Sequence, residues 1–202
     1  KVMKKNILCV KWGNKYDDYV EKLKTQIEQH CSYDFNFYCL TDNPQKSYDL
    51  ELPTHWDSHF NPDTNSFWAY RDEFLFLDLD ILIHKSIDPL FEADITKPRI
   101  VRGWWNDIET CRKNFGKGKS TPLNSSVIRW NRGQLLPIYN QINLNTEYVF
   151  FTYKTIDNYF NQLWYDVHDE RNGFLKGFPK GLIYSWYKGN IYPEDMFKKV
   201  LR

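Results

Sequence analysis

The sequence lacks an excess of charge of either sign. Its 202 residues carry 27 Lys and Arg against 26 Asp and Glu, which gives a net charge of +1. A surface that binds nucleic acid usually shows a marked basic excess, so we expect no nucleic-acid partner. No apolar stretch reaches the roughly 18 residues of a membrane-spanning helix. We therefore expect no transmembrane segment, and peripheral contact with a membrane stays open.

Cysteine is scarce and shows no pairing pattern. The four cysteines form no C-x-x-C motif and no dense framework, which favours free thiols in a reducing compartment. The apolar stretch at residues 7–10 is shorter than the hydrophobic region of a signal peptide, so we expect a cytoplasmic protein. The length suits one domain with its own core, and no composition shift marks a boundary. We expect a single domain over residues 1–202.

Several common catalytic motifs are also absent. Neither G-x-G-x-x-G nor G-x-S-x-G occurs, which removes support for dinucleotide binding and for an elbow serine. Gly118-Lys119-Ser120 suggests a phosphate-binding loop, but the first glycine of that motif would fall on Lys113. His55 and His59 are close in sequence but lie in a proline-flanked loop, where surface histidines are the ordinary explanation. The basic, glycine-containing residues 106–121 predict a loop that closes over a ligand.

The hydrophobic pattern predicts an α/β fold. An apolar strand at residues 6–12 ends at a Gly-Asn turn, helical periodicity follows from Tyr16 to Ile27, and a second strand covers residues 35–40. A strand, helix and strand within about 40 residues form a right-handed crossover unit with parallel strands, whose carboxyl edge is suited to bind nucleotides. We expect further strands at 48–52, 100–105, 127–130 and 182–187, and helices at 66–73, 87–91, 134–141 and 155–164.

The most informative stretch is the apolar run from Phe74 to Ile83, which two acids interrupt. In an extended strand, Asp78 and Asp80 project to the same face and Leu79 to the other. Two carboxylates about 6 Å apart repel by roughly 3 kcal/mol at an effective dielectric near 20. A divalent cation relieves this repulsion and could hold a phosphate-bearing ligand. An ordinary acidic turn after a strand is the alternative.

A phosphatase of the haloacid dehalogenase type also places an acid pair after an apolar strand. Its motif continues with Gly-Thr and a tight turn, with the first acid as nucleophile. Here Ile81-Leu82 follow Asp80, which predicts a continuing strand and argues against this class.

Taken together, the motifs resemble those of nucleotide-sugar-dependent glycosyltransferases of the GT-A fold. The resemblance is to small bacterial-type enzymes distantly similar to the glycogenin and lipopolysaccharide galactosyltransferase type. It rests on six segments in the same order along the chain. These are residues 7–16, 38–42, 77–81 with 87–91, 104–106, 124–127 and 184–188.

The resemblance implies a single Rossmann-like GT-A domain, with a mostly parallel central sheet flanked by helices. It implies transfer of a sugar from a nucleoside-diphosphate sugar to a hydroxyl acceptor on a glycan, lipid or protein. Asp78 and Asp80 would hold Mn2+ or Mg2+ against the diphosphate, and Lys188 would neutralise the leaving group. Asp157 would contact the reacting sugar or the acceptor. The other donor-binding residues implied are Lys11, Trp12, Gly13, Tyr16, Thr41, Asp42, Arg71, Leu79, Asn124 and Ser125.

The chain departs from the family pattern at three points. The segment from Trp68 to Asp78 is shorter than its counterpart in the family. Asn158 follows Asp157 where related sequences carry glutamine, and no late histidine supplies a third metal ligand. Two other functions stay open. One is a metal-dependent phosphatase or nucleotidyltransferase that uses the same acid pair. The other is a non-catalytic sugar-binding domain built on the aromatic residues, which make up 18% of the chain.

Overall fold

A computed structural model gives the fold of residues 4–14, 16–51, 73–92, 95–103, 123–161, 184–185 and 196–199. These are the residues described below. Arg71, Lys188, the predicted helix at 66–73 (up to residue 72) and the predicted loop at 106–121 lie outside them.

The first half of the fold is a parallel strand–helix–strand unit. Strand β1 (Lys5–Lys11) pairs in parallel with β2 (Phe35–Thr41), and β2 pairs in parallel with β3 (Asp49–Glu51). Helix α1 (Asp17–His30) joins the two longer strands and buries Val20, Leu23 and Ile27 at helical spacing. Because helices cover both faces, the middle of β1 is apolar without alternation. The crossover predicted from the sequence is confirmed.

The seven-stranded sheet has the order β3-β2-β1-β4-β7-β6-β8. Strand β4 (Phe74–Leu77) pairs in parallel with β1, and β6 (Arg99–Arg102) pairs in parallel with β8 (Tyr184–Ser185). Strand β7 (Leu123–Trp130) lies between β4 and β6 and runs antiparallel to both. The sheet is therefore mostly parallel, as expected, with one reversed strand at its centre.

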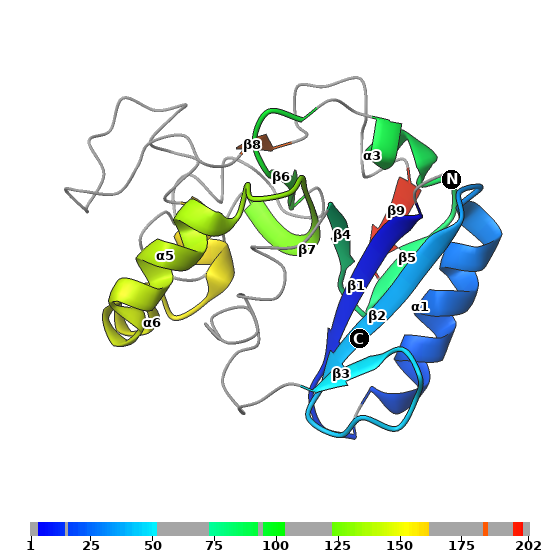
Figure 1. The fold of residues 1–202 in the computed structure, drawn as a ribbon, viewed down its shortest axis with the longest axis horizontal. Helices are drawn as coiled ribbons and strands as arrows, with labels where there is room; N and C mark the ends of the chain where they lie inside the picture. The colour runs from blue at the N-terminus through cyan, green and yellow to red at the C-terminus, as the bar shows by residue number, and fades with distance from the viewer. Residues whose placement is uncertain are drawn as a thin grey trace.

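Two hydrophobic cores cover the two faces of the sheet. Helix α1, the short helix α3 (Asp88–Glu92) and the small sheet of β5 (Ile81–Ile83) and β9 (Phe197–Lys199) share one core with the inner strands. Helices α5 (Leu136–Leu144) and α6 (Thr146–Tyr153) and the helical residues 156–161 share the other. Figure 1 shows α1 on one side of the sheet and the α5–α6 pair on the other.

The run from Phe74 to Ile83 is not one strand, which corrects the prediction. Strand β4 ends at Leu77, and β5 begins at Ile81 in a different sheet, paired with β9. Residues 78–80 form the turn between them, so the two acids do not follow the alternation of an extended strand. Both strands are apolar because both are buried, so the hydrophobic pattern on either side of the acids does not reveal the break.

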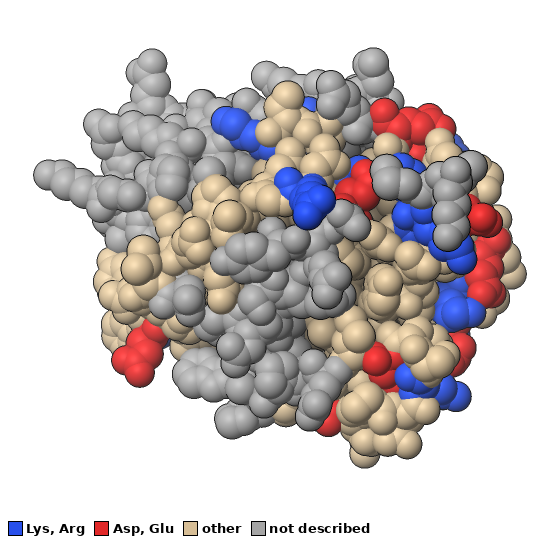
Figure 2. Space-filling model, in the orientation of Figure 1, with Lys and Arg blue, Asp and Glu red and all other residues tan. Residues whose placement is uncertain are grey.

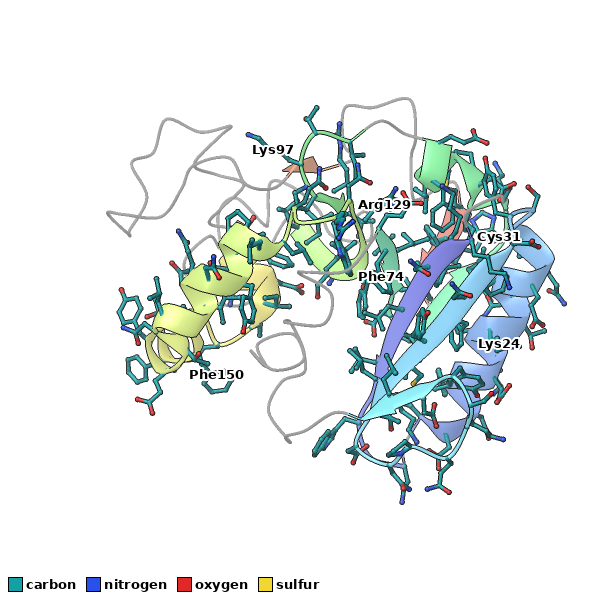
Figure 3. All side chains as sticks on the ribbon, viewed as in Figure 1. Lys24, Cys31, Phe74, Lys97, Arg129 and Phe150 are labelled. Carbon is teal, nitrogen blue, oxygen red and sulfur yellow. The ribbon has the colours of Figure 1, made fainter. Side chains whose placement is uncertain are left out.

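A buried arginine lies at the centre of the sheet. Arg129 of β7 is 2% exposed, and its guanidinium donates to Glu73 Oε2 at 2.7 Å and to Asn131 Oδ1 at 2.9 Å. Glu73 also accepts from Lys5 Nζ at 2.8 Å through its other oxygen. Figure 3 labels Arg129 on the sheet side that carries α3, where the guanidinium lies 5.8 Å from the Phe91 ring. This network ties β7 to the start of β4 and to β1.

The described surface agrees with the near-neutral composition. Figure 2 shows Lys and Arg interspersed with Asp and Glu, with no continuous field of one sign on the described part of this face. Within the described ranges, no helix has the length and apolarity needed to cross a membrane. Cys9, Cys31 and Cys39 are free thiols, as expected for three of the four cysteines.

Candidate functional site

The predicted site residues converge on one edge of the large sheet. Parallel strands β1, β2 and β4 end at the same edge, and the antiparallel β7 begins there. We call this region, which comprises residues 11–14, 16, 41–42, 78–80 and 124–126, the carboxyl edge. In Figure 1 the chain enters β1 near the mark N, and the strand runs away from it toward this edge. The fold thus brings four separate segments of the sequence together.

A turn at Gly13, after the end of β1, is hydrogen-bonded to Asp42, which follows the end of β2. Gly13 has a φ of +67°, and its N–H donates to both carboxylate oxygens of Asp42, at 3.0 and 3.2 Å. Thr41 is 1% exposed, and its hydroxyl accepts from the Asn43 N–H at 3.3 Å. Beside this turn, Trp12 is 43% exposed although it is large and apolar. The turn therefore presents an indole ring beside a fixed carboxylate.

We expect Gly13→Ala to destabilise the fold by about 1 kcal/mol, because an L side chain is strained at positive φ. A Cβ at this position meets nothing within 4 Å, so backbone strain is the whole cost. Gly13→Asn should cost less, since asparagine tolerates the left-handed region better. Urea unfolding of the three proteins measures this. Equal losses for alanine and asparagine would contradict the explanation by backbone strain.

Two predicted donor-binding residues are engaged with α1. Lys11 Nζ lies 2.6 Å from Asp17 Oδ1 in the first turn of that helix, and this hydrogen bond raises the pKa of Lys11. The ring of Tyr16 packs edge-on against Tyr19 at 5.4 Å between centroids. Both residues lie at the carboxyl edge, and the Lys11 contact links the end of β1 to the start of α1.

The acid turn follows β4 directly. The N–H of Asp78 donates to the Ser126 carbonyl at 2.8 Å, which continues the β4–β7 ladder by one residue. Asp78 Oδ1 accepts from the Leu79 N–H at 3.0 Å. The Leu79 side chain is 7% exposed and belongs to the core on the α1 face. Any contact of Leu79 with a ligand at this edge is therefore through its backbone.

The two acids are suited to a hard divalent cation. Asp80 is 2% exposed, and Asp78 is half-buried two residues earlier in the same turn. A hard divalent cation prefers oxygen ligands, and two carboxylates in one turn supply them. In the part of the chain that the structure describes, no third His, Cys, Asp or Glu completes a cluster. Water completes the shell of Mg2+ in many proteins with one or two carboxylates.

Strand β7 contains a bulge beside the acid turn. Ile100 of β6 pairs with Ile128, but the next residue, Val101, pairs with Asn124. Residues 125–127 therefore have no partner on β6, although Val127 still pairs with Leu77 of β4. Bulges of this kind redirect side chains and occur next to active sites.

Asp157, which follows α6 in the sequence, accepts hydrogen bonds from residues 124 and 125 at the bulge. Its Oδ1 accepts from the Ser125 N–H at 2.7 Å, and its Oδ2 accepts from the Asn124 side-chain amide at 3.1 Å. Asn124 Oδ1 in turn accepts from the Ser126 N–H at 2.9 Å and from the Ser126 hydroxyl. The Ser125 hydroxyl is half-buried beside this junction.

The residue after Asp157 is directed elsewhere. The side-chain amide of Asn158 donates to the Tyr153 carbonyl at 2.6 Å, and its N–H donates to Thr155 Oγ1 at 3.3 Å. These bonds fix the start of the helical residues 156–161 against the end of α6. The side chain of Asn158 is therefore engaged in a local bond to the end of α6.

The structure brings most of the predicted residues together and adds one. Ser126 was not among them, although its N–H and hydroxyl donate to Asn124 and its carbonyl accepts from Asp78. The only sequence signal was the polar run Asn124-Ser125-Ser126 before an apolar strand. Arg71 and Lys188 lie outside the described residues, so their proximity to this edge stays a prediction.

Comparison with known proteins gives a match at the level of structure. No family model and no curated sequence matches the chain. Among solved structures, the glycosyltransferase GlyE of Streptococcus pneumoniae TIGR4 matches with a TM-score of 0.59 at 15% identity, over 90% of this chain and 45% of that one. An active-site mutant of LgtC matches with a TM-score of 0.58 at 15% identity, over 89% of this chain and 72% of that one.

A third similar structure is a glycosyltransferase involved in glycosylation of the major capsid of PBCV-1. It matches with a TM-score of 0.50 at 17% identity, over 92% of this chain and 83% of that one. The chain spans less than half the length of the GlyE structures, at 39% and 45%. These likenesses confirm the expected fold class: the chain has the α/β fold of GT-A glycosyltransferases.

Proposed function

We propose that the chain transfers a sugar from a nucleoside diphosphate to a hydroxyl acceptor at the carboxyl edge. The observation that carries the proposal is the junction of β4 and β7, where Asp78 bonds Ser126 and Asp157 bonds Asn124 and Ser125. The pair of acids that we propose as the cation site thus lies beside polar groups suited to sugar hydroxyls. The same edge carries an exposed indole on which a nucleotide base can stack. The fold match to glycosyltransferases supports this reading.

Each segment of the edge has a role in this function. Trp12 and the Gly13–Asp42 turn would hold the base and ribose, and the Ser125 hydroxyl would bond the donor sugar. Asp78 and Asp80 would hold Mn2+ or Mg2+, which neutralises charge on the diphosphate leaving group when bound. Lys188 would add a second positive charge there, and Arg71 would contact the donor phosphates. The acceptor would be a glycan, a lipid or a protein hydroxyl.

A binding screen tests the proposal. We expect UDP, GDP, ADP or CDP to raise the melting temperature of the protein in the presence of MnCl2, and to do so much less in the presence of EDTA. A ligand that binds only the folded state stabilises it by about 2.7 kcal/mol at 100 times its Kd, which is a readily measured shift. If none of the four nucleotides stabilises the protein in either condition, the proposed donor is wrong.

A phosphatase or nucleotidyltransferase stays the second candidate because of one observation. Residues 78–80 form a turn directly after β4, and a turn after the first acid is what the phosphatase reading required. Product analysis separates the classes. A glycosyltransferase releases free nucleoside diphosphate and a glycosylated acceptor, whereas a phosphatase releases inorganic phosphate. If the protein binds plain glycans in the absence of metal and nucleotide, the hypothesis of a non-catalytic sugar-binding domain is favoured instead.

A further inference from the structure

We infer that Asp157 is a positioning residue for the acid turn, and that it acts through the β7 bulge. This inference rests on the proposed function and deepens it, because it replaces the expected contact of Asp157 with the reacting sugar or acceptor. Both carboxylate oxygens of Asp157 accept hydrogen bonds from the bulge, at 2.7 Å from the Ser125 N–H and at 3.1 Å from the Asn124 amide.

The bulge creates the need for this carboxylate. Because the register of β7 on β6 jumps between Ile128 and Asn124, the Ser125 N–H has no carbonyl of β6 to bond. A buried or half-buried N–H without an acceptor costs about 1–3 kcal/mol, so the bulge needs an acceptor from outside the sheet. Asp157 lies in the first turn of the helical residues 156–161 and provides it.

The chain of hydrogen bonds continues to the acids. Asn124, held by Asp157, accepts from Ser126 through Oδ1 at 2.9 Å. The Ser126 carbonyl then accepts from the Asp78 N–H at 2.8 Å. Asp157 is thereby connected to the first residue of the acid turn through two side-chain bonds and one backbone bond. Loss of the Asp157 charge would loosen the position of Asp78 without any contact to the ligand.

The helix that carries Asp157 is itself fixed, so it can hold the bulge in place. Thr155 caps it by accepting the Asn158 N–H, and the Asn158 amide bonds the Tyr153 carbonyl at the end of α6. Tyr153 and Tyr159 pack edge to face at 5.3 Å between centroids inside the same core. A carboxylate on a rigid, packed support is suited to position another segment.

The test uses a ligand without a sugar. Isothermal titration calorimetry measures the Kd of the best-binding nucleoside diphosphate of the screen in the presence of MnCl2, for wild type and for Asp157→Asn. Groups that orient metal ligands change metal affinity by about 10- to 100-fold when removed, so we expect binding about tenfold weaker. If Asp157 instead contacts the transferred sugar or the acceptor, the variant binds this sugar-free ligand as wild type does and loses only turnover. That result overturns the inference.

Two further variants separate positioning from general destabilisation. Asn158→Ala removes a hydrogen bond of the same helix that is not directed to the bulge, and we expect it to lower the melting temperature without changing the Kd. Asn124→Ala interrupts the connection, and the double variant with Asp157→Asn should bind no more weakly than the weaker single variant. Equal loss of affinity in Asn158→Ala would show that the effect is loosening of the helix, and it would overturn the inference.

The outcomes also distinguish this inference from the proposed function. If wild type binds the nucleotide and Asp80→Asn does not, while Asp157→Asn binds normally, only the inference fails. If wild type binds none of the nucleotides with MnCl2, both fail together.

Discussion

Asp80→Asn is expected to weaken Mn2+-dependent nucleotide binding by at least about 100-fold, because it removes one of two proposed cation ligands and keeps the size of the side chain. Residues that only support a ligand change metal affinity by about 10- to 100-fold, so loss of a ligand should reach the upper end of that range. Asp80 is 2% exposed in the turn after β4. Calorimetry with the nucleoside diphosphate and MnCl2 measures the loss, and circular dichroism checks that the fold is kept.

Asp88→Asn is the matched control for this prediction. It changes the net charge equally but lies at the opposite edge of the sheet, where Asp88 accepts from the Ser32 N–H at 2.9 Å shortly before β2 begins. We expect its affinity for nucleotide to equal that of wild type. If Asp80→Asn and Asp88→Asn bind nucleotide equally well, the acid turn is not a cation site.

Glu73→Ala is expected to lower the free energy of unfolding by about 3 kcal/mol, because it leaves the buried Arg129 guanidinium without its carboxylate. Burial lowers the pKa of Arg129, and Glu73 is the group that opposes this effect. For a chain of this size the loss corresponds to a fall in melting temperature of about 10 °C. Urea unfolding and calorimetry measure both quantities.

Two comparisons test the cause. Lys5→Ala removes the other, more exposed partner of Glu73, 2.8 Å away and 21% exposed, and should cost no more than about 1 kcal/mol. The double variant Glu73→Leu with Arg129→Met removes both buried charges and should be more stable than Glu73→Ala, since an apolar replacement of a buried pair is often neutral. A double variant less stable than Glu73→Ala would show that packing, and not the unpaired charge, sets the cost.

Local patterns predicted the first half of the fold well. The helix at Asp17–His30 followed from apolar residues at helical spacing, and its flanking strands followed from short buried runs. The break between β4 and β5 was missed because both strands are apolar. They differ only in their pairing, since β4 pairs with β7 and β5 pairs with β9. Helix α6 was missed because it is apolar on several sides and gives no clear periodicity.

The residues of the candidate site could be proposed from the sequence, but the hydrogen bonds that connect them could not. The acid pair and the Asn-Ser-Ser run could be found in the sequence, because their chemistry is visible in short segments. The role of Asp157 depends on a register jump between β6 and β7 and on a contact across 32 residues. The burial of Arg129 depends on a partner 56 residues away. Such distant pairings leave no local pattern, so sequence reasoning assigned Asp157 by family resemblance alone.

The pairing of β5 with β9 has a consequence for how the protein is made. Ile81–Ile83, directly after the acid turn, pair with Phe197–Lys199, and the His84 N–H donates to the Met196 carbonyl at 2.9 Å. This contact joins segments that emerge from the ribosome far apart in time, and such long-range pairing forms slowly. During synthesis the α1 crossover can assemble early, whereas the segment behind the acids gains its partner only after the strands from β6 to β8 have been made.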